Sequence, residues 1–243
     1  MIVSIVIPAY DEVERLPHTV DAVLAEAARW PFTLELVLVD DGSSDGTLLL
    51  MQRFADDDAR VRVVSYGTNR GKGAAVAAGV AASRGDFVVF FDADLSYPLA
   101  AVPAALTLFD EGADVVIGAR DLAPSGRAEY GLLRKVASTS FNAIVEAVLH
   151  LGVRDTQCGF KAFRGAIARA LFPALEVRGF GFDVELLYLI RRWQLDLRLL
   201  PLKMNARAGS SVSVARASAE MLRDVLRIRL RAARGRYPAP PIR

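Results

Sequence analysis

The sequence predicts an α/β protein with a Rossmann-like, mostly parallel sheet and helices on both faces. Segments of strand type alternate with segments of helix type over the first 118 residues, and the longest strand segments are apolar along almost their whole length. Strands that are apolar on both sides must be covered on both sides, which is typical of parallel sheets. A chain of 243 residues suits one such domain with a short appendage.

The elements are expected in a regular order. Short apolar or β-branched runs predict strands at residues 2–7, 34–39, 62–65, 87–91 and 115–117. Apolar residues at helical spacing predict helices between them at residues 17–28, 46–54, 71–83 and 99–109. Beyond residue 118 we expect a functional loop at 119–131, helices at 132–151, 182–193 and 217–233, a strand at 197–202 and a frayed tail from Gly235.

Charge is distributed unevenly along the chain. The net charge is +2, but residues 203–243 carry ten Lys or Arg and two acids, so the rest of the chain carries −6. The single Cys158 allows no intrachain disulfide, which fits a reducing compartment. The chain start lacks the basic region of a signal peptide, and no apolar run reaches the roughly 18 residues of a membrane-spanning helix. We therefore expect a cytoplasmic protein, with peripheral contact to the cytoplasmic face of the membrane as an option for the basic segment.

Acidic residues follow three of the predicted strands. They stand in the segments Pro8-Ala9-Tyr10-Asp11-Glu12, Asp40-Asp41-Gly42-Ser43-Ser44-Asp45-Gly46-Thr47 and Asp92-Ala93-Asp94. Ligands of such sheets bind beyond the carboxyl ends of the strands, and crowded carboxylates need a compensating cation. Oxygen ligands with few Cys or His favour Mg²⁺ or Mn²⁺. The alternatives are a turn with a helix cap for residues 40–47 and a solvated strand end for residues 92–94.

The segment Asn69-Arg70-Gly71-Lys72-Gly73-Ala74 precedes a predicted helix. Glycines allow close backbone approach, a helix start offers free N–H groups, and Lys72 adds positive charge, so this segment predicts a phosphate site. It half matches a dinucleotide fingerprint. The glycines of that fingerprint belong after the first strand, where this chain has Pro8-Ala9-Tyr10, so we do not favour an oxidoreductase.

Five strings occur in order along the chain: SIVIPAYDE, LVLVDDGSSDGT, NRGKGAA, VVFFDAD and RDTQCGFKAF. Together they resemble the family 2 glycosyltransferases of the GT-A fold, and within that family the dolichyl- and polyprenyl-phosphate sugar synthases, most of all those that transfer glucose. The resemblance implies a GT-A catalytic domain over residues 1–212, with a nucleotide-binding half at 1–118 and an acceptor-binding half at 119–212. A basic amphipathic helix and tail at 213–243 would follow it.

The resemblance also implies roles for individual residues. The nucleotide sugar would contact Pro8, Ala9, Tyr10, Glu12, Asp41, Lys72, Asp92, Ala93 and Arg207. Asp94 and Asp92 would bind the metal, and the acceptor phosphate would contact Arg120, Arg127, Arg134 and Gln157. The catalytic set would be Asp94, Asp155, Arg120 and Arg134. For Asp155 two readings stay open, a base and a residue that orders its loop.

The implied reaction is inverting transfer of a hexose from a nucleotide diphosphate sugar to a dolichyl or polyprenyl phosphate. UDP-glucose is the favoured donor and GDP-mannose the next. Two alternatives are a family 2 transferase that acts on a soluble or glycan hydroxyl, with Asp155 or Glu185 as base, and an inactive nucleotide-sugar-binding subunit.

The basic C-terminal helix has two faces. Arg216, Arg223, Arg227, Arg231 and Arg234 share one face, and Met221, Val225, Ile228 and Ala232 share the opposite one. The helix either packs on the body with a solvated basic face or anchors the protein to anionic lipid. Nucleic acid is not an expected partner, because no aromatic residues interleave the arginines.

Overall fold

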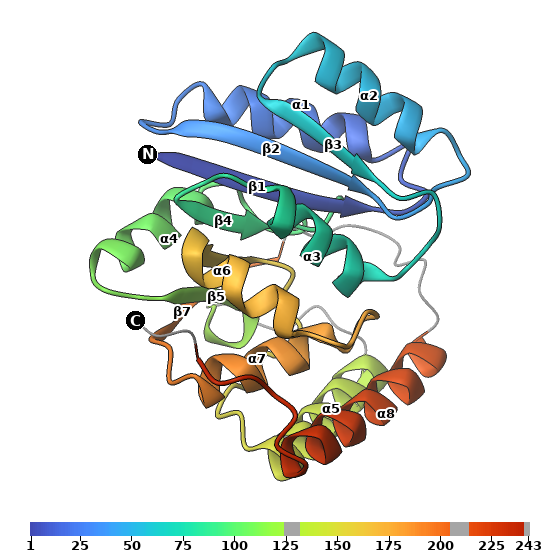
Figure 1. Ribbon diagram of the computed structural model, residues 1–243, viewed down its shortest axis with the longest axis vertical. Coiled ribbons are helices and arrows are strands. Elements are labelled where there is room, and N and C mark those ends of the chain that lie inside the picture. Colours follow the sequence, from blue (N-terminus) through green and yellow to red (C-terminus); the bar gives the residue numbers. More distant parts are fainter. Residues whose placement is uncertain (124–131, 205–213, 241–243) are drawn as a thin grey trace.

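The computed structural model describes residues 1–123, 132–204 and 214–240, and in the two helices after the gaps it describes side chains from Phe141 and Glu220 onward. Its described strands form one sheet in the order β3-β2-β1-β4-β6-β5-β7 (Figure 1). The strands are β1 (Ile2–Ala9), β2 (Thr33–Asp40), β3 (Val61–Ser65), β4 (Phe87–Phe90), β5 (Val115–Ala119), β6 (Lys161–Arg164) and β7 (Leu197–Pro201). Every pairing is parallel except those of β6, which runs antiparallel to β4 and β5. The predicted mostly parallel α/β fold is confirmed.

The helices lie on both sides of this sheet. They are α1 (Leu16–Ala27), α2 (Thr47–Asp57), α3 (Lys72–Ala82), α4 (Ala101–Asp110), α5 (Leu132–Leu149), α6 (Gly165–Leu171), α7 (Phe182–Arg192) and α8 (Val214–Ala233), with short 3-10 turns at Arg120–Leu122 and Phe172–Ala174. Helices α3, α6 and α7 contact one another, and α5 lies beside α8 at the lower end of Figure 1. The central strands β1 and β2 are buried after their first residue, as apolar strands in a covered sheet should be.

Strand β6 and helix α6 were missed by the sequence patterns. The strand has only four residues, Lys-Ala-Phe-Arg, and its lysine interrupts the apolar run that marks a buried strand. Lys161 is nevertheless fully buried, because the ammonium group pairs with Asp183 on α7. A pairing with a distant residue therefore permits a strand that the local pattern does not indicate.

The expectation of a frayed tail from Gly235 is wrong for the part that the structure describes. Tyr237 is 4% exposed, and its hydroxyl donates to Glu185 Oε1 at 2.7 Å. Its ring also packs against Tyr188, and the indole N–H of Trp193 donates to the Pro238 carbonyl at 3.2 Å. An aromatic ring with a buried partner for its hydroxyl holds the segment that its prolines suggested would be loose.

Helix α8 packs its apolar face on the body. Met221, Val225 and Ile228 are buried, and the helix contacts α5 and α7. This confirms the prediction of a surface helix packed on the body, but the predicted basic face is not solvated throughout, because the Arg231 side chain is 17% exposed and pairs with Glu176. The helix begins at Val214 rather than at residue 217. Among the described residues, no helix is long and apolar enough to span a membrane. The division of the chain at residues 118 and 212 stays a prediction.

Candidate active site

The carboxyl ends of three neighbouring strands bring the predicted segments to one edge of the sheet. Strand β1 lies between β2 and β4, with Ala9 in register with Asp40 and Val6 in register with Phe90. The residues that follow these strands therefore share one rim, which is where an open parallel sheet binds its ligand.

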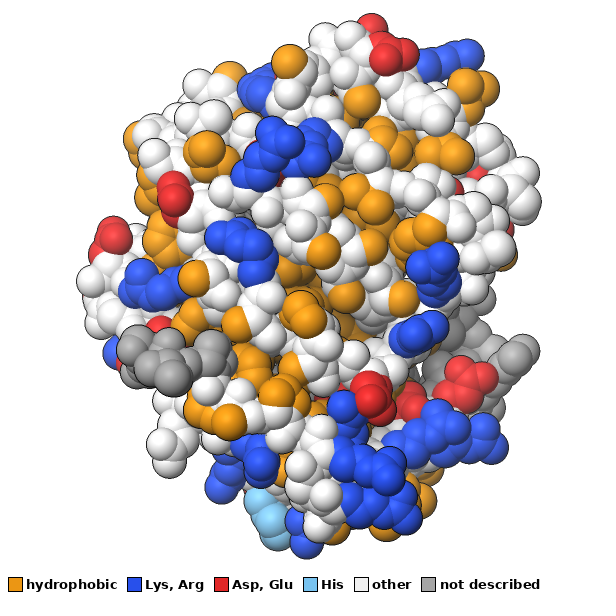
Figure 2. All heavy atoms as spheres, in the orientation of Figure 1, with side chains coloured by type: hydrophobic (Ala, Val, Ile, Leu, Met, Phe, Trp, Pro, Cys, Tyr) orange, Lys and Arg blue, Asp and Glu red, His pale blue; other side chains and the backbone are white. Residues whose placement is uncertain are grey.

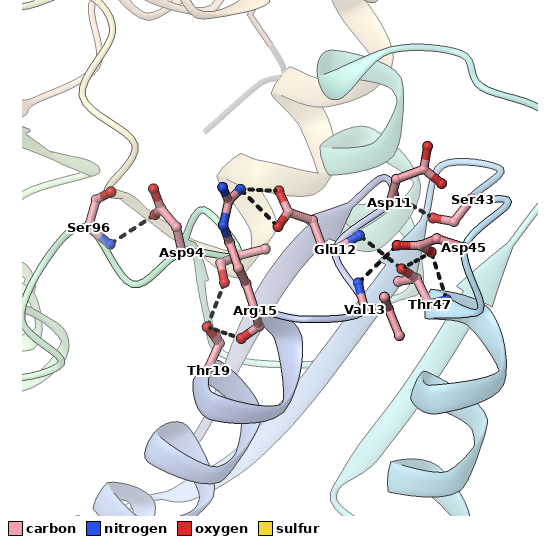
Figure 3. A network of polar contacts seen from close by, with 11 residues as sticks. Asp11, Glu12, Val13, Arg15, Thr19, Ser43, Asp45, Thr47, Asp94 and Ser96 are labelled. Carbon is pink, nitrogen blue, oxygen red and sulfur yellow. Dashed lines mark hydrogen bonds and ion pairs between the residues drawn. The ribbon is translucent and has the colours of Figure 1, made fainter. Parts of the chain in front are cut away.

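The loops after β1 and β2 are joined by polar contacts (Figure 3). Asp11 takes a left-handed conformation and accepts from the Ser44 amide at 2.7 Å, while its own amide donates to Ser43 Oγ at 3.0 Å. The amide of Glu12 donates to Thr47 Oγ1 at 2.9 Å, and Asp45 Oδ1 accepts from the Thr47 amide at 2.9 Å. Asp11 and Asp45 thus order the loops, so the turn part of the alternative for residues 40–47 describes Asp45, whereas the N-cap of α2 is Gly46 and no side chain caps it.

Asp41 organises the loop before α3. It is 3% exposed, its Oδ1 accepts from the Tyr66 hydroxyl at 2.6 Å and the Arg70 amide at 2.8 Å, and its Oδ2 accepts from the Gly71 amide at 2.9 Å. Burial and the hydrogen bond to Asp41 raise the pKa of Tyr66, so its hydroxyl remains a donor at neutral pH. The predicted contact between Asp41 and a nucleotide base stays a prediction.

Lys72 opens helix α3 beside Asp92. The ammonium group lies 2.5 Å from Asp92 Oδ1, with the two side chains 21% and 31% exposed. Burial lowers the pKa of Lys72, but the nearby carboxylates of Asp92 and Asp183 outweigh it and raise that pKa above its usual value. The lysine is therefore charged at neutral pH at the start of a helix, as an anion site requires.

The segment Asp92-Ala93-Asp94 is held in place from two sides. The Ala93 carbonyl accepts from Thr19 Oγ1 at 2.5 Å, and Asp94 Oδ1 accepts from the Ser96 amide at 3.0 Å. Figure 3 draws the Arg15 guanidinium between the carboxylates of Glu12 and Asp94. Burial raises the pKa of Glu12, the nearby Arg15 lowers it, and Asp94 adds to the rise.

The predicted carboxylates do not by themselves form a metal cage. Among the described residues, no group of three or more His, Cys, Asp or Glu is arranged to hold a metal ion. Asp92 is engaged by Lys72, while Asp94 points along the same rim (Figure 3). Two carboxylates fit a divalent cation that brings further oxygen ligands with its substrate, as Mg²⁺ commonly does. The assignment of Asp92 and Asp94 to a metal stays a prediction.

Arg120 and Asp155 form a tight buried pair. Asp155 is 2% exposed, its Oδ2 accepts from the Arg120 Nε at 2.8 Å and from the Arg120 amide at 2.9 Å, and its Oδ1 accepts from Nη2 at 2.5 Å. Such a fork fixes the plane of the guanidinium. A buried carboxylate held by Arg120 in this way agrees with the interpretation that Asp155 orders its loop.

The structure describes only some of the other predicted site residues. Tyr10 is 48% exposed at the rim, while Pro8 and Ala9 are buried at the end of β1. The amide of Gln157 contacts Met221 Sδ of α8 at 2.7 Å. Arg127 and Arg207 lie outside the described residues, and Arg134 belongs to α5 with a side chain that is not described.

The sequence patterns missed a second ion pair beneath the rim. Lys161 Nζ lies 2.6 Å from Asp183 Oδ1, donates to the Cys158 carbonyl at 2.7 Å and lies 5.2 Å from the Phe90 ring centre. The side chains are 0% and 7% exposed. The sequence did hold a signal for this pair, because Lys161 and Asp183 each interrupt a mostly apolar stretch. Charged residues in such stretches are usually buried with a partner.

This mostly parallel sheet, with charged residues at the carboxyl ends of its central strands, has the GT-A glycosyltransferase fold. Two solved structures share the fold. Mannosyl-3-phosphoglycerate synthase from Rubrobacter xylanophilus has a TM-score of 0.71 at 20% identity, covering 99% of this chain and 77% of that one. Glucosyl-3-phosphoglycerate synthase from Mycobacterium tuberculosis, solved with Mn²⁺, UDP-glucose and phosphoglyceric acid, has a TM-score of 0.68 at 23% identity, covering 93% and 79%.

The chain belongs to glycosyl transferase family 2, whose profile matches residues 4–172. The dolichyl-phosphate beta-glucosyltransferase of Drosophila melanogaster is 34% identical over 244 residues, covering 94% of this chain and 74% of the relative. The human protein of the same name is 32% identical over 254 residues, covering 94% and 75%. The family that the five strings indicated is therefore confirmed.

Proposed function

We propose that this protein is an inverting hexosyltransferase that moves glucose from UDP-glucose to a dolichyl or polyprenyl phosphate. The observation that carries the proposal is the Lys72–Asp92 pair at the rim, a positive charge at a helix start beside the strand-end carboxylates. Such a charge suits the diphosphate of a nucleotide sugar. The names of the relatives in Drosophila and human support glucose and a dolichyl phosphate acceptor. GDP-mannose is the second donor to test.

Asp94 and Asp92 would hold a Mg²⁺ or Mn²⁺ ion that brings the donor diphosphate to the rim. Such an ion would neutralise the negative charge that builds on the leaving nucleoside diphosphate. The glucosyl-3-phosphoglycerate synthase solved with Mn²⁺ and UDP-glucose supports this kind of donor complex. Lys72 would contribute a fixed positive charge on the same side, since Asp92 holds its ammonium group in place.

The acceptor needs little help from a base. A phosphate monoester has a second pKa of about 6, so most of it is a dianion near neutral pH. Arg120 would bind this phosphate and align it with the anomeric carbon, and Arg127 and Arg134 would join it there. Asp155 would act as a positioning residue, because its carboxylate is buried against the Arg120 guanidinium. Inversion would give a β-linked product from an α-linked donor.

Peripheral contact with an anionic membrane at its cytoplasmic face would bring this site to a lipid acceptor. The outward side of α8 supports it, because Leu226 and Leu230 are 59% and 55% exposed among arginines. Exposed leucines beside basic residues are typical of helices that lie in a membrane interface.

The test is transfer by the purified full chain, with Mg²⁺ or Mn²⁺, from UDP-glucose and from GDP-mannose to a short polyprenyl phosphate. We expect glucose transfer, and we expect Asp94→Ala to lower kcat/KM by about 10²-fold or more while the thermal unfolding midpoint stays near that of the wild type. Asp56→Ala, an exposed aspartate on α2, is the matched control and should retain full activity.

Three outcomes would contradict parts of this proposal. Normal turnover of Asp94→Ala with added Mn²⁺ would remove the metal assignment. Transfer only to sugar hydroxyls would point to the soluble-acceptor alternative. Binding of UDP-glucose without transfer to any acceptor would point to an inactive binding subunit.

A further inference from the structure

A cavity lies away from the strand ends, between α8, the turn before α7 and the C-terminal tail. It has a volume of about 700 Å³. The lining includes four acidic residues, Glu176, Glu185, Glu220 and Asp224. It also includes six arginines, Arg178, Arg223, Arg227, Arg231, Arg234 and Arg236. Figure 2 shows these basic and acidic side chains gathered over α8 at the lower right of the molecule. Arginine exceeds acid in the lining, so the cavity favours an anion.

The acidic residues of the lining are already engaged. Glu185 accepts from the amides of Glu176 and Val177 at 2.8 Å and 2.7 Å, and from the Tyr237 hydroxyl at 2.7 Å. Asp224 pairs with Arg227 at 3.2 Å, and Glu176 pairs with Arg231. Glu220 is not free either. Six arginines against four acids still leave the lining with two more positive than negative side chains.

Four of the arginines keep their side chains available. Arg178, Arg223, Arg234 and Arg236 are exposed, and within the described part of the chain their side chains form no hydrogen bond or ion pair. The buried Nε of Arg231 also lacks a hydrogen-bond acceptor among the described residues. Arginine forks match the oxygen geometry of phosphate groups, and several forks around one cavity can bind one phosphate together.

We propose that this cavity is a binding site for a phosphate-bearing anion, separate from the rim that holds Lys72 and Asp94. The phosphate group would come either from a membrane lipid headgroup or from a soluble phosphate compound. The exposed Leu230 lines the same cavity, so a lipid could place its headgroup among the arginines and its chain beside the leucine. The inference does not depend on the transfer reaction.

One wall of the cavity, at Arg178, also contacts the start of α3 and the loop before it. The Arg178 carbonyl accepts from the Ala74 amide at 3.1 Å, and a Cβ at Gly71 would come within 2.7 Å of that carbonyl oxygen. An anion bound by Arg178 would therefore contact the turn whose backbone carbonyl accepts from the start of α3. Binding at the cavity and binding at the rim must accordingly be measured separately.

The experiment compares two variants of the full chain, each with two arginine substitutions and the same Lys72→Met background. Arg223→Gln/Arg234→Gln removes two exposed cavity arginines. Arg192→Gln/Arg229→Gln removes two exposed arginines outside the cavity, one of them on α8. Both pairs carry an added Lys72→Met change, which weakens diphosphate binding at the rim. Calorimetric titration with pyrophosphate probes a soluble phosphate, and sedimentation with vesicles of phosphatidylglycerol in phosphatidylcholine probes a lipid headgroup.

We expect the cavity variant to bind at least one probe about tenfold more weakly than the outside variant. A loss confined to pyrophosphate identifies a soluble phosphate, and a loss confined to vesicles identifies a lipid headgroup. Equal binding of both probes by the two variants would overturn the proposal, because surface charge alone would then explain it. Thermal unfolding of both variants checks that these exposed changes leave the fold intact.

Discussion

Two lysine–aspartate pairs, one at the rim and one beneath it, differ mainly in their access to solvent. Lys161 and Asp183 are 0% and 7% exposed, whereas Lys72 and Asp92 are 21% and 31% exposed, although the two ion-pair distances are 2.6 Å and 2.5 Å. Asp183 raises the pKa of Lys72, and burial raises the pKa of Asp183 although Lys161 and Lys72 both oppose that rise. The two ion-pair distances are nearly equal, so the difference in exposure decides the expected roles. We expect the buried pair to stabilise the fold and the accessible pair to bind a ligand.

The largest effect should come from breaking the buried pair. Lys161→Met leaves the carboxylate of Asp183 without its ammonium partner, and removing one member of a buried pair costs about 3–5 kcal/mol of unfolding free energy. Urea denaturation measures this loss. Lys161→Met/Asp183→Leu should recover most of it, because no unpaired charge remains. A single variant as stable as the wild type would show that the pair contributes little to the fold.

A smaller loss of stability, with a large loss of activity, should follow when the accessible pair is broken. Lys72→Met removes a positive charge from the expected diphosphate site, and we expect kcat/KM for glucose transfer to fall by about 10²- to 10³-fold. Its urea midpoint should stay close to that of the wild type, because Asp92 can be solvated at the rim. Steady-state kinetics with varied UDP-glucose measures the change. Wild-type kinetics in Lys72→Met would assign Lys72 to structure alone.

The smallest effect should come from moving the accessible pair without removing its charges. A Cβ at Gly159 would overlap the Asp92 carboxylate, so Gly159→Ala should displace that carboxylate while both charges remain. We expect kcat/KM to fall by about tenfold with little change in urea midpoint. Gly179→Ala is a control for loss of a glycine, since a Cβ there meets no atom within 4 Å and its φ lies outside the left-handed region. Full activity of Gly159→Ala would show that the position of Asp92 is not critical.

Much of the fold could be predicted from local patterns. Apolar runs indicated β1, β2 and β4, and the acids after them indicated one shared rim, which the strand order confirms. Strand β6 and the docked tail could not be found in this way. Lys161 and Tyr237 are buried because their partners, Asp183 and Glu185, come from α7, and periodicity carries no information about such distant partners.

The candidate site also has features that the sequence predicted and features that only the structure shows. The pattern of residues placed Asp41, Lys72 and Asp92 at one edge of the sheet. It did not indicate that Asp41 holds the Arg70 and Gly71 amides or that Asp155 holds Arg120. Several carboxylates that the patterns treated alike therefore differ in how much of their hydrogen-bonding capacity remains for a ligand.

The sequence alone determined the order of strands and helices from β1 to β5, the family and the segments at the rim, because these depend on periodicity and on short strings of neighbouring residues. The tertiary structure decided which charges are paired and which remain accessible. Lys72 of α3 meets Asp92 after β4, and Lys161 of β6 meets Asp183 of α7, each across about twenty residues of chain, because α3 and α7 pack on each other beside the sheet. Coulomb energy and desolvation depend on distance and burial, and both are set only when those elements pack.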